Sequence, residues 1–69
     1  MGSVARVTEI SSTSEKSFED AIKSGVDRAT KTLRNVTSAW IKEQRVEVDK
    51  KGKITSFQVN MLVTFVLEG

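Results

Sequence analysis

The stretch "SFQVNMLVTFVL", residues 56–67, decides the fold of this chain. Apolar side chains occupy every second position from Phe57 to Leu67, and this period of two indicates a long β-strand with one wholly apolar face. The opposite face is polar but keeps Leu62 and Val66. Such a mixed face suits a wet interface or a ligand site better than bulk solvent.

Two further strands are expected upstream of this one. Residues 4–10 are rich in β-branched side chains, which predicts a first strand, and a second strand is expected from about residue 37 to residue 49. Residues 49–53, "DKKGK", form a polar hairpin loop in which Gly52 can take a positive φ. The second and third strands are therefore expected to pair as a hairpin.

An amphipathic helix is expected between the first and second strands. The hydroxyl-rich residues 11–17 suit a turn and a helix N-cap, with Ser14 or Thr13 as the capping side chain. Asn35 is the residue expected at C′, just after the helix C-cap. The apolar positions recur at helical spacing and form one stripe, made of Phe18, Ala21, Ile22, Gly25, Val26, Ala29 and Leu33.

This order of elements predicts an α+β fold. We expect a β-α-β-β subunit with one helix packed on a three-stranded antiparallel sheet, as a single domain of residues 1–69.

The helix stripe covers roughly 22 Å, whereas the apolar row of the last strand spans roughly 33 Å. One helix cannot cover that row, and an exposed remainder on a long edge invites pairing with another chain.

Composition also favours self-association and excludes several classes of function. Small folds usually need additional stabilisation from disulfides, a structural metal or oligomerisation. A chain without cysteine or histidine can form neither disulfides nor thiolate or imidazole zinc sites, which leaves oligomerisation. A net charge of +2 with scattered basic residues is not typical of a nucleic-acid binder. No apolar run reaches the ~20 residues of a membrane span, and no signal-peptide segment is evident, so a cytoplasmic protein is expected. No activated nucleophile or acid–base pair is recognisable, which argues against an enzyme.

Four segments together resemble the dodecin family: "STSE" (12–15), "AIKSGVDRATKTLRNV" (21–36), "KEQR" (42–45) and "FQVNMLVTFVLE" (57–68). The resemblance implies β-α-β-β subunits assembled into a hollow homododecamer. Many dodecins bind flavins in pairs at subunit interfaces, for storage and photoprotection rather than catalysis. In those members a tryptophan of the second strand stacks on the ring and a glutamine of the third strand binds the ring's polar edge. An arginine near the end of the second-strand motif binds phosphate in bacterial members.

The resemblance carries over to four residues of this chain. Gln58 matches the family glutamine and Arg45 the family arginine, but the stacking tryptophan is expected at position 38, where this chain has Ser38. Trp40 lies two residues later, which returns to the same face of a strand roughly 7 Å further along. We therefore expect Trp40, Gln58, Arg45 and Ser38 to form the cofactor site.

Each of these residues also has a purely structural interpretation. Trp40 can fill a subunit interface, Gln58 can bond across strands, and Arg45 can pair with a nearby carboxylate. The leading hypothesis is a non-catalytic, self-assembling protein that binds riboflavin or FMN. The alternative is the same dodecamer without flavin, as a structural shell or a calcium or other small-ligand binder; binding of coenzyme A is left open. Calcium needs about six to eight oxygens, and the candidate donors are Glu15, Glu19 and Asp20, or Glu43, Glu47 and Asp49.

Overall fold

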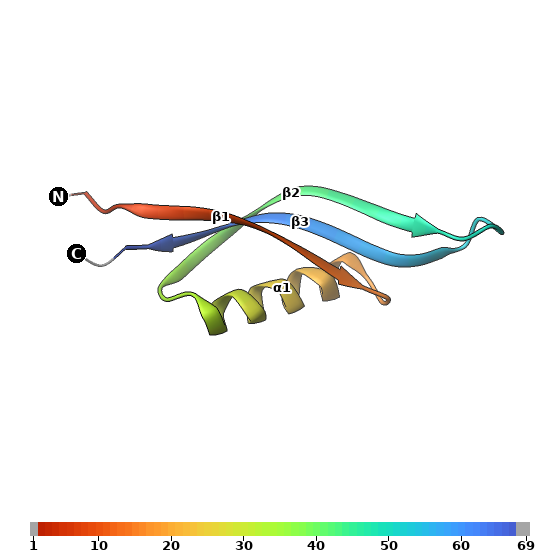
Figure 1. The fold of residues 1–69 in the computed structure, drawn as a ribbon, viewed down its shortest axis with the longest axis horizontal. Coiled ribbons are helices and arrows are strands. Elements are labelled where there is room, and N and C mark those ends of the chain that lie inside the picture. Colours follow the sequence, from red (N-terminus) through yellow and green to blue (C-terminus); the bar gives the residue numbers. More distant parts are fainter. Residues whose placement is uncertain (1, 68–69) are drawn as a thin grey trace.

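The computed structural model has the expected β-α-β-β order and describes residues 2–67 (Figure 1). Met1, Glu68 and Gly69 of the expected single domain lie outside the described residues. The elements are β1 (Ala5–Ser14), α1 (Phe18–Thr32), β2 (Val36–Val48) and β3 (Ile54–Val66). One helix packs on a three-stranded antiparallel sheet, so the α+β prediction is confirmed.

The strand order β1-β3-β2 places the most regular strand in the middle of the sheet. β3 pairs with β1 from Ala5↔Val66 to Ser14↔Phe57, and with β2 along its whole length. The expectation that the long apolar strand leaves an open edge is therefore wrong. β1 and β2 are the edge strands, because the helical crossover between them leaves room for β3 in the centre.

Of the hydroxyl-rich residues 11–17, expected to form a turn and an N-cap, residues 11–14 are the end of β1, and only residues 15–17 form the turn and the cap. Residues 11–14 continue the ladder with β3, whose long backbone provides partners that a local pattern cannot reveal. The expected capping role of Thr13 or Ser14 is consequently wrong. The N-cap is Ser17, whose Oγ accepts a hydrogen bond of 3.0 Å from the backbone N–H of Asp20.

Ser14 supports the same turn from the end of the strand. Its Oγ accepts the backbone N–H of Lys16 at 2.9 Å and donates to Asp20 Oδ2 at 2.6 Å. The Asp20 carboxylate also lies in the first turn of α1, where negative charge is favourable. The strand therefore passes directly into the helix.

Among the described residues, those with a positive φ angle lie in the two remaining turns. Leu33 is the C-cap of α1, so C′ is Arg34 and the prediction of Asn35 at C′ is wrong by one position, although Asn35 takes the left-handed conformation with φ 62°. Gly52 has φ 85° in the β2–β3 hairpin, as expected. Asp49 Oδ1 accepts the N–H groups of Lys51 and Lys53, each at 2.9 Å, and holds this loop closed.

The core lies between α1 and one face of the sheet. Its buried apolar residues are Ala21, Ala29, Val59, Met61 and Val63. α1 approaches closely at Gly25, where a Cβ would lie 2.9 Å from Met61 Cε and 3.1 Å from Ser12 Cβ. The small residues of the helix stripe thus allow the larger residues of β3 to fill the interface.

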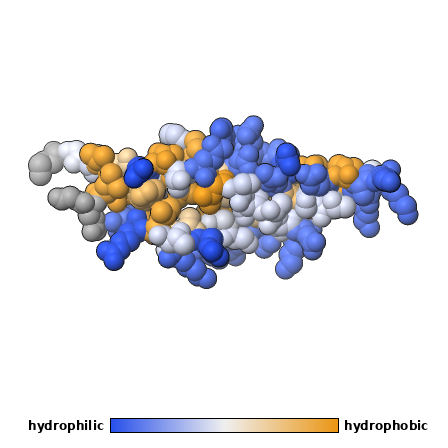
Figure 2. Space-filling model, in the orientation of Figure 1, coloured by the Kyte–Doolittle hydropathy of each residue, from blue (hydrophilic) through white to orange (hydrophobic). Residues whose placement is uncertain are grey.

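The helix covers only part of this face, as the lengths predict. The molecule is 55 Å long, whereas the 15 residues of α1 span roughly 22 Å. α1 begins beside Phe57, where Phe18 packs edge-on with ring centroids 5.1 Å apart, and the β2–β3 hairpin projects past this point (Figure 1). Apolar surface gathers at the opposite end, with a smaller area towards the hairpin (Figure 2). The exposed large apolar residues are Val4, Val7, Trp40, Ile41, Val48, Ile54 and Leu67.

Candidate functional site

The four residues expected in the cofactor site lie on the face of the sheet that α1 does not cover, here called the open face. Their cross-strand partners decide this: Ser38 opposes Thr64, Trp40 opposes Leu62, and Arg45 opposes Gln58. These β3 residues alternate with Val59, Met61 and Val63, which are buried beneath α1. Both Ser38 and Trp40 therefore point away from the helix, as their two-residue spacing predicts.

Trp40 presents its indole to the outside of the subunit. Its side chain is 68% exposed, and its row across the sheet consists of Trp40, Leu62 and Glu9. Ser38 lies in the adjoining row with Thr64. Trp40 is therefore not packing for this subunit's own core, and its ring is available to a ligand or to another subunit.

Gln58 belongs to a polar network that spans all three strands. Its Nε2 donates to Ser11 Oγ on β1 at 2.9 Å and to Asn60 Oδ1 at 3.2 Å. Asn60 Nδ2 in turn donates to Glu43 Oε1 on β2 at 3.3 Å. The cross-strand bond expected as the structural role of Gln58 is thus present in its bond to Ser11, while the bond to Asn60 lies within β3.

Arg45 lies beside Gln58 and is paired with a carboxylate. Its guanidinium donates to Glu47 Oε1 at 2.9 Å, with the two side chains 67% and 54% exposed. Exposed ion pairs contribute only about 0–1 kcal/mol, so this pair can open at little cost. A hollow of about 160 Å³ joins the two residues, lined by Glu43, Gln44, Arg45, Gln58 and Asn60.

The subunit does not bring Trp40 to this hollow. Trp40 opposes Leu62 and Arg45 opposes Gln58, so the two sites are four residues apart along β3, or roughly 13 Å. The structure therefore brings together Gln58 and Arg45, and leaves Trp40 and Ser38 as a separate part of the same face.

An ion pair that the sequence pattern did not single out lies between these two parts. Lys42 Nζ on β2 is 3.2 Å and 3.4 Å from the carboxylate oxygens of Glu9 on β1. Lys42 falls at a register shift between Ile41 and Glu43. No local signal identifies this contact, because it depends on how two edge strands register with the central one.

The carboxylates proposed as calcium ligands are not clustered within one subunit. Among residues 2–67, no group of three or more Asp, Glu, His or Cys side chains is placed to hold a metal ion. Asp20 accepts the hydroxyl of Ser14, and Glu47 pairs with Arg45. A calcium site built from these residues would need further oxygens, from backbone carbonyls, water or a second subunit.

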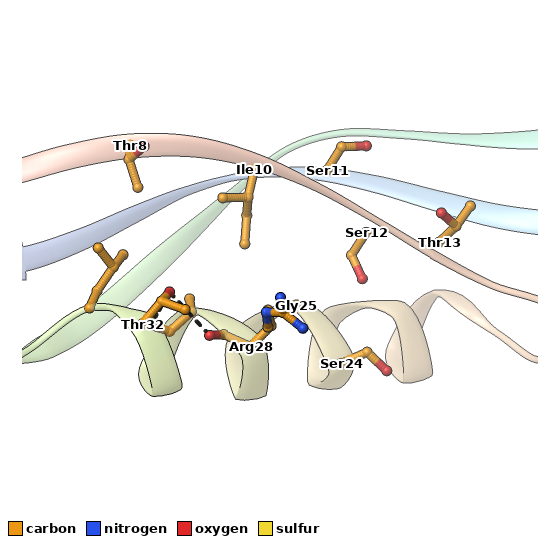
Figure 3. A pocket seen from close by; sticks show the side chains of 11 residues that line it. Thr8, Ile10, Ser11, Ser12, Thr13, Ser24, Gly25, Arg28 and Thr32 are labelled. Carbon is orange, nitrogen blue, oxygen red and sulfur yellow. Dashed lines mark hydrogen bonds between the residues drawn. The ribbon is translucent and has the colours of Figure 1, made fainter.

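A larger groove lies on the other side of the sheet, between α1 and β1. It has a volume of about 530 Å³, and Figure 3 shows Thr8, Ile10 and Ser12 pointing from β1 towards the helix. None of the four expected cofactor residues lines it.

In the described part of the chain no helix is long and apolar enough to cross a membrane.

Comparisons with known proteins agree on one family. A family model described as Dodecin matches residues 4–68. A dodecin from Thermus thermophilus is 38% identical over 68 residues, covering 99% of this chain and 97% of that protein.

Solved structures support the same assignment. A dodecin from Streptomyces davaonensis has a TM-score of 0.91 at 35% identity, with 100% of both chains covered. A calcium dodecin from Mycobacterium tuberculosis, described as calcium-chelating with a novel calcium-binding site, has a TM-score of 0.81 at 33% identity, covering 96% of this chain and 93% of its own. The chain therefore belongs to the dodecin family, whose members are small, non-catalytic ligand-binding proteins that assemble from copies of one subunit.

Proposed function

We propose that this protein is a flavin-binding dodecin. In this proposal, copies of the chain form a hollow dodecamer that holds riboflavin or FMN where the open faces of two subunits meet, and stores the flavin without catalysis. The observation that carries the proposal is the exposed indole of Trp40 beside Leu62 on the face of the sheet that α1 leaves uncovered. An aromatic side chain in this position offers a flat ring a stacking surface.

The spacing of the site residues supports a ligand shared between subunits. Trp40 and Gln58 are roughly 13 Å apart within one chain, so one ring cannot easily contact both in the same subunit. If two open faces meet about a two-fold axis, the Trp40 of one subunit approaches the Gln58 of the other. Flavin binding would then depend on assembly.

The remaining residues would set the affinity and the choice of flavin. Gln58 would hydrogen-bond to the polar edge of the ring, and Ser38 would leave space beside the Trp40 indole. Arg45 would exchange the Glu47 carboxylate for the phosphate of FMN, since the exposed pair costs little to open. We therefore expect FMN to bind more tightly than riboflavin, with Arg45→Ala removing the difference.

A fluorescence titration tests the proposal. Stacking on tryptophan quenches flavin emission, so riboflavin and FMN should lose fluorescence as the protein is added. Light scattering on the same samples gives the mass of the assembly and tests the dodecamer separately. Unchanged emission at high protein excess, with the assembly intact, would exclude flavin storage and leave the fold assignment untouched.

A second candidate function is a flavin-free dodecamer that binds calcium. The supporting observation is the similarity to the calcium dodecin from Mycobacterium tuberculosis, together with the displacement of the tryptophan from position 38 to 40. The acidic side chains of β2, such as Glu43 and Glu47, would then contribute oxygens from neighbouring subunits. Calorimetric titration with Ca²⁺, using Mg²⁺ as the control, distinguishes this function from flavin storage.

A cytoplasmic location remains a prediction.

A further inference from the structure

The Lys42–Glu9 ion pair crosses the open face next to the Trp40 row. Glu9 and Leu62 are register partners, as are Leu62 and Trp40, so Glu9 lies at the far end of the row that begins with Trp40. Lys42 starts from β2 between Trp40 and Glu43, and its Nζ reaches the Glu9 carboxylate on β1 at 3.2 Å. The Lys42 side chain therefore extends across β3. It separates the Trp40–Leu62 surface from the Asn60 and Gln58 network.

This ion pair offers both donor and acceptor groups next to Trp40. An ammonium group has three N–H donors, and a carboxylate has about four acceptor positions. Lys42 Nζ contacts both carboxylate oxygens of Glu9, and the two side chains are each 46% exposed. Gln58 of the same subunit lies roughly 13 Å away, and it donates its amide protons to Ser11 and Asn60 while its carbonyl oxygen remains an acceptor. Lys42 and Glu9 are thus charged groups beside Trp40 that have donors and acceptors to spare.

The chemistry of this arrangement points to one type of ligand edge. A flat ring stacked on Trp40 and Leu62 would have one edge against the ion pair. An ammonium donor beside a carboxylate acceptor complements an imide edge, in which a ring N–H lies between two carbonyl groups. The Lys42 ammonium would donate to a carbonyl oxygen, and the Glu9 carboxylate would accept the ring N–H. The pyrimidine-dione part of a flavin has such an edge.

We propose that Lys42 and Glu9 determine specificity at the Trp40 site, selecting planar aromatic ligands that carry an imide edge. The inference rests on the proposed function, because it takes the ring of the ligand to be stacked on Trp40. It adds a determinant that lies in the same subunit as the tryptophan. Asp27, an exposed carboxylate of α1 on the other side of the sheet, serves as the control.

The test compares riboflavin with 3-methylriboflavin, in which a methyl group replaces the imide proton. With the assembled wild-type protein, fluorescence titration should show riboflavin binding about 10- to 100-fold more tightly, because a charge-assisted hydrogen bond is lost on methylation. Glu9→Gln and Lys42→Met should weaken riboflavin binding and reduce the preference over the methylated ligand. Asp27→Asn should leave that preference unchanged.

The outcomes separate this inference from the proposed function. Equal binding of the two ligands by the wild-type protein would overturn the role of the ion pair while supporting flavin storage. The same conclusion follows if Glu9→Gln and Lys42→Met assemble normally and keep the full preference. Failure of the wild-type protein to quench either ligand would overturn both proposals. Because the proposed function also places Gln58 at the polar edge of the ring, the variants decide which residues carry the preference, and either variant suffices if the other fails to assemble.

Discussion

Trp40 and Gln58 share the open face of the sheet but lie four residues apart along β3, since Trp40 opposes Leu62 and Gln58 opposes Arg45. This separation of roughly 13 Å makes a binding site of a single subunit incomplete for a ligand that needs both groups. Family membership and the uncovered apolar surface both indicate association between subunits.

Replacing Trp40 tests whether its ring carries the affinity. Trp40→Ala should weaken flavin binding about 5- to 150-fold, because loss of one stacking surface costs roughly 1–3 kcal/mol. Trp40→Phe should retain part of the affinity, since a smaller π-face remains. Fluorescence titration measures both variants, and light scattering confirms that they assemble. Full quenching by Trp40→Ala would show that the indole has no role in stacking.

Moving the tryptophan back to the family position tests the effect of its displacement. Ser38 and Trp40 lie in adjoining rows of the same face, so the double variant Ser38→Trp, Trp40→Ser moves the ring by roughly 7 Å without changing composition. We expect the exchanged protein to bind flavin more tightly than the wild type, because the ring returns to the position that the family uses. Weaker binding by the exchanged protein would indicate that this site has adapted to Trp40.

Ser17→Ala tests the start of the helix. The Ser17 hydroxyl accepts the N–H of Asp20, and loss of an N-cap costs about 0.5–2 kcal/mol. The free energy of unfolding, measured by denaturant titration at fixed subunit concentration, should fall by that amount. Ser24→Ala is the matched control, because Ser24 is exposed in the same helix. An equal effect of the two substitutions would contradict the capping role of Ser17.

Gly25→Val tests the close approach of helix and sheet. A Cβ at this position would lie 2.9 Å from Met61 Cε and 3.1 Å from Ser12 Cβ, so the larger side chain must push α1 away from the sheet. Overpacking of this kind costs about 1–3 kcal/mol, although valine has a better helix propensity than glycine. Thermal unfolding should therefore occur at a lower temperature than for Ser24→Val, the exposed neighbour. Equal melting temperatures would mean that the helix can shift without cost.

Local patterns predicted most of the fold because each element carries its own period. The alternation from Phe57 to Leu67 and the helical spacing from Phe18 to Leu33 are properties of neighbouring residues. The predictions were wrong where pairing between strands that are distant in the sequence overrides the local preference of the residues. The hydroxyl-rich residues 11–14 have turn chemistry, yet they form strand because β3 provides a continuous ladder for them.

The candidate site was predicted only in part, and for the same reason. The shared face of Ser38 and Trp40 follows from a spacing of two residues along one strand. The bonds of Gln58 to Ser11 and of Lys42 to Glu9 join residues that are distant in the sequence. Their contact depends on the register between strands, and a slip of one residue would turn each side chain to the other face.

By itself, then, the amino-acid sequence determined the kinds of elements, their order, and the excess of apolar strand over helix, because these are set by the period and length of local segments. The tertiary structure alone decided that β3 is central, that Ser17 caps α1, and that an ion pair separates Trp40 from Gln58. These features depend on backbone pairing between distant strands. That pairing is set by the packing of the whole subunit and cannot be predicted from any single stretch of sequence.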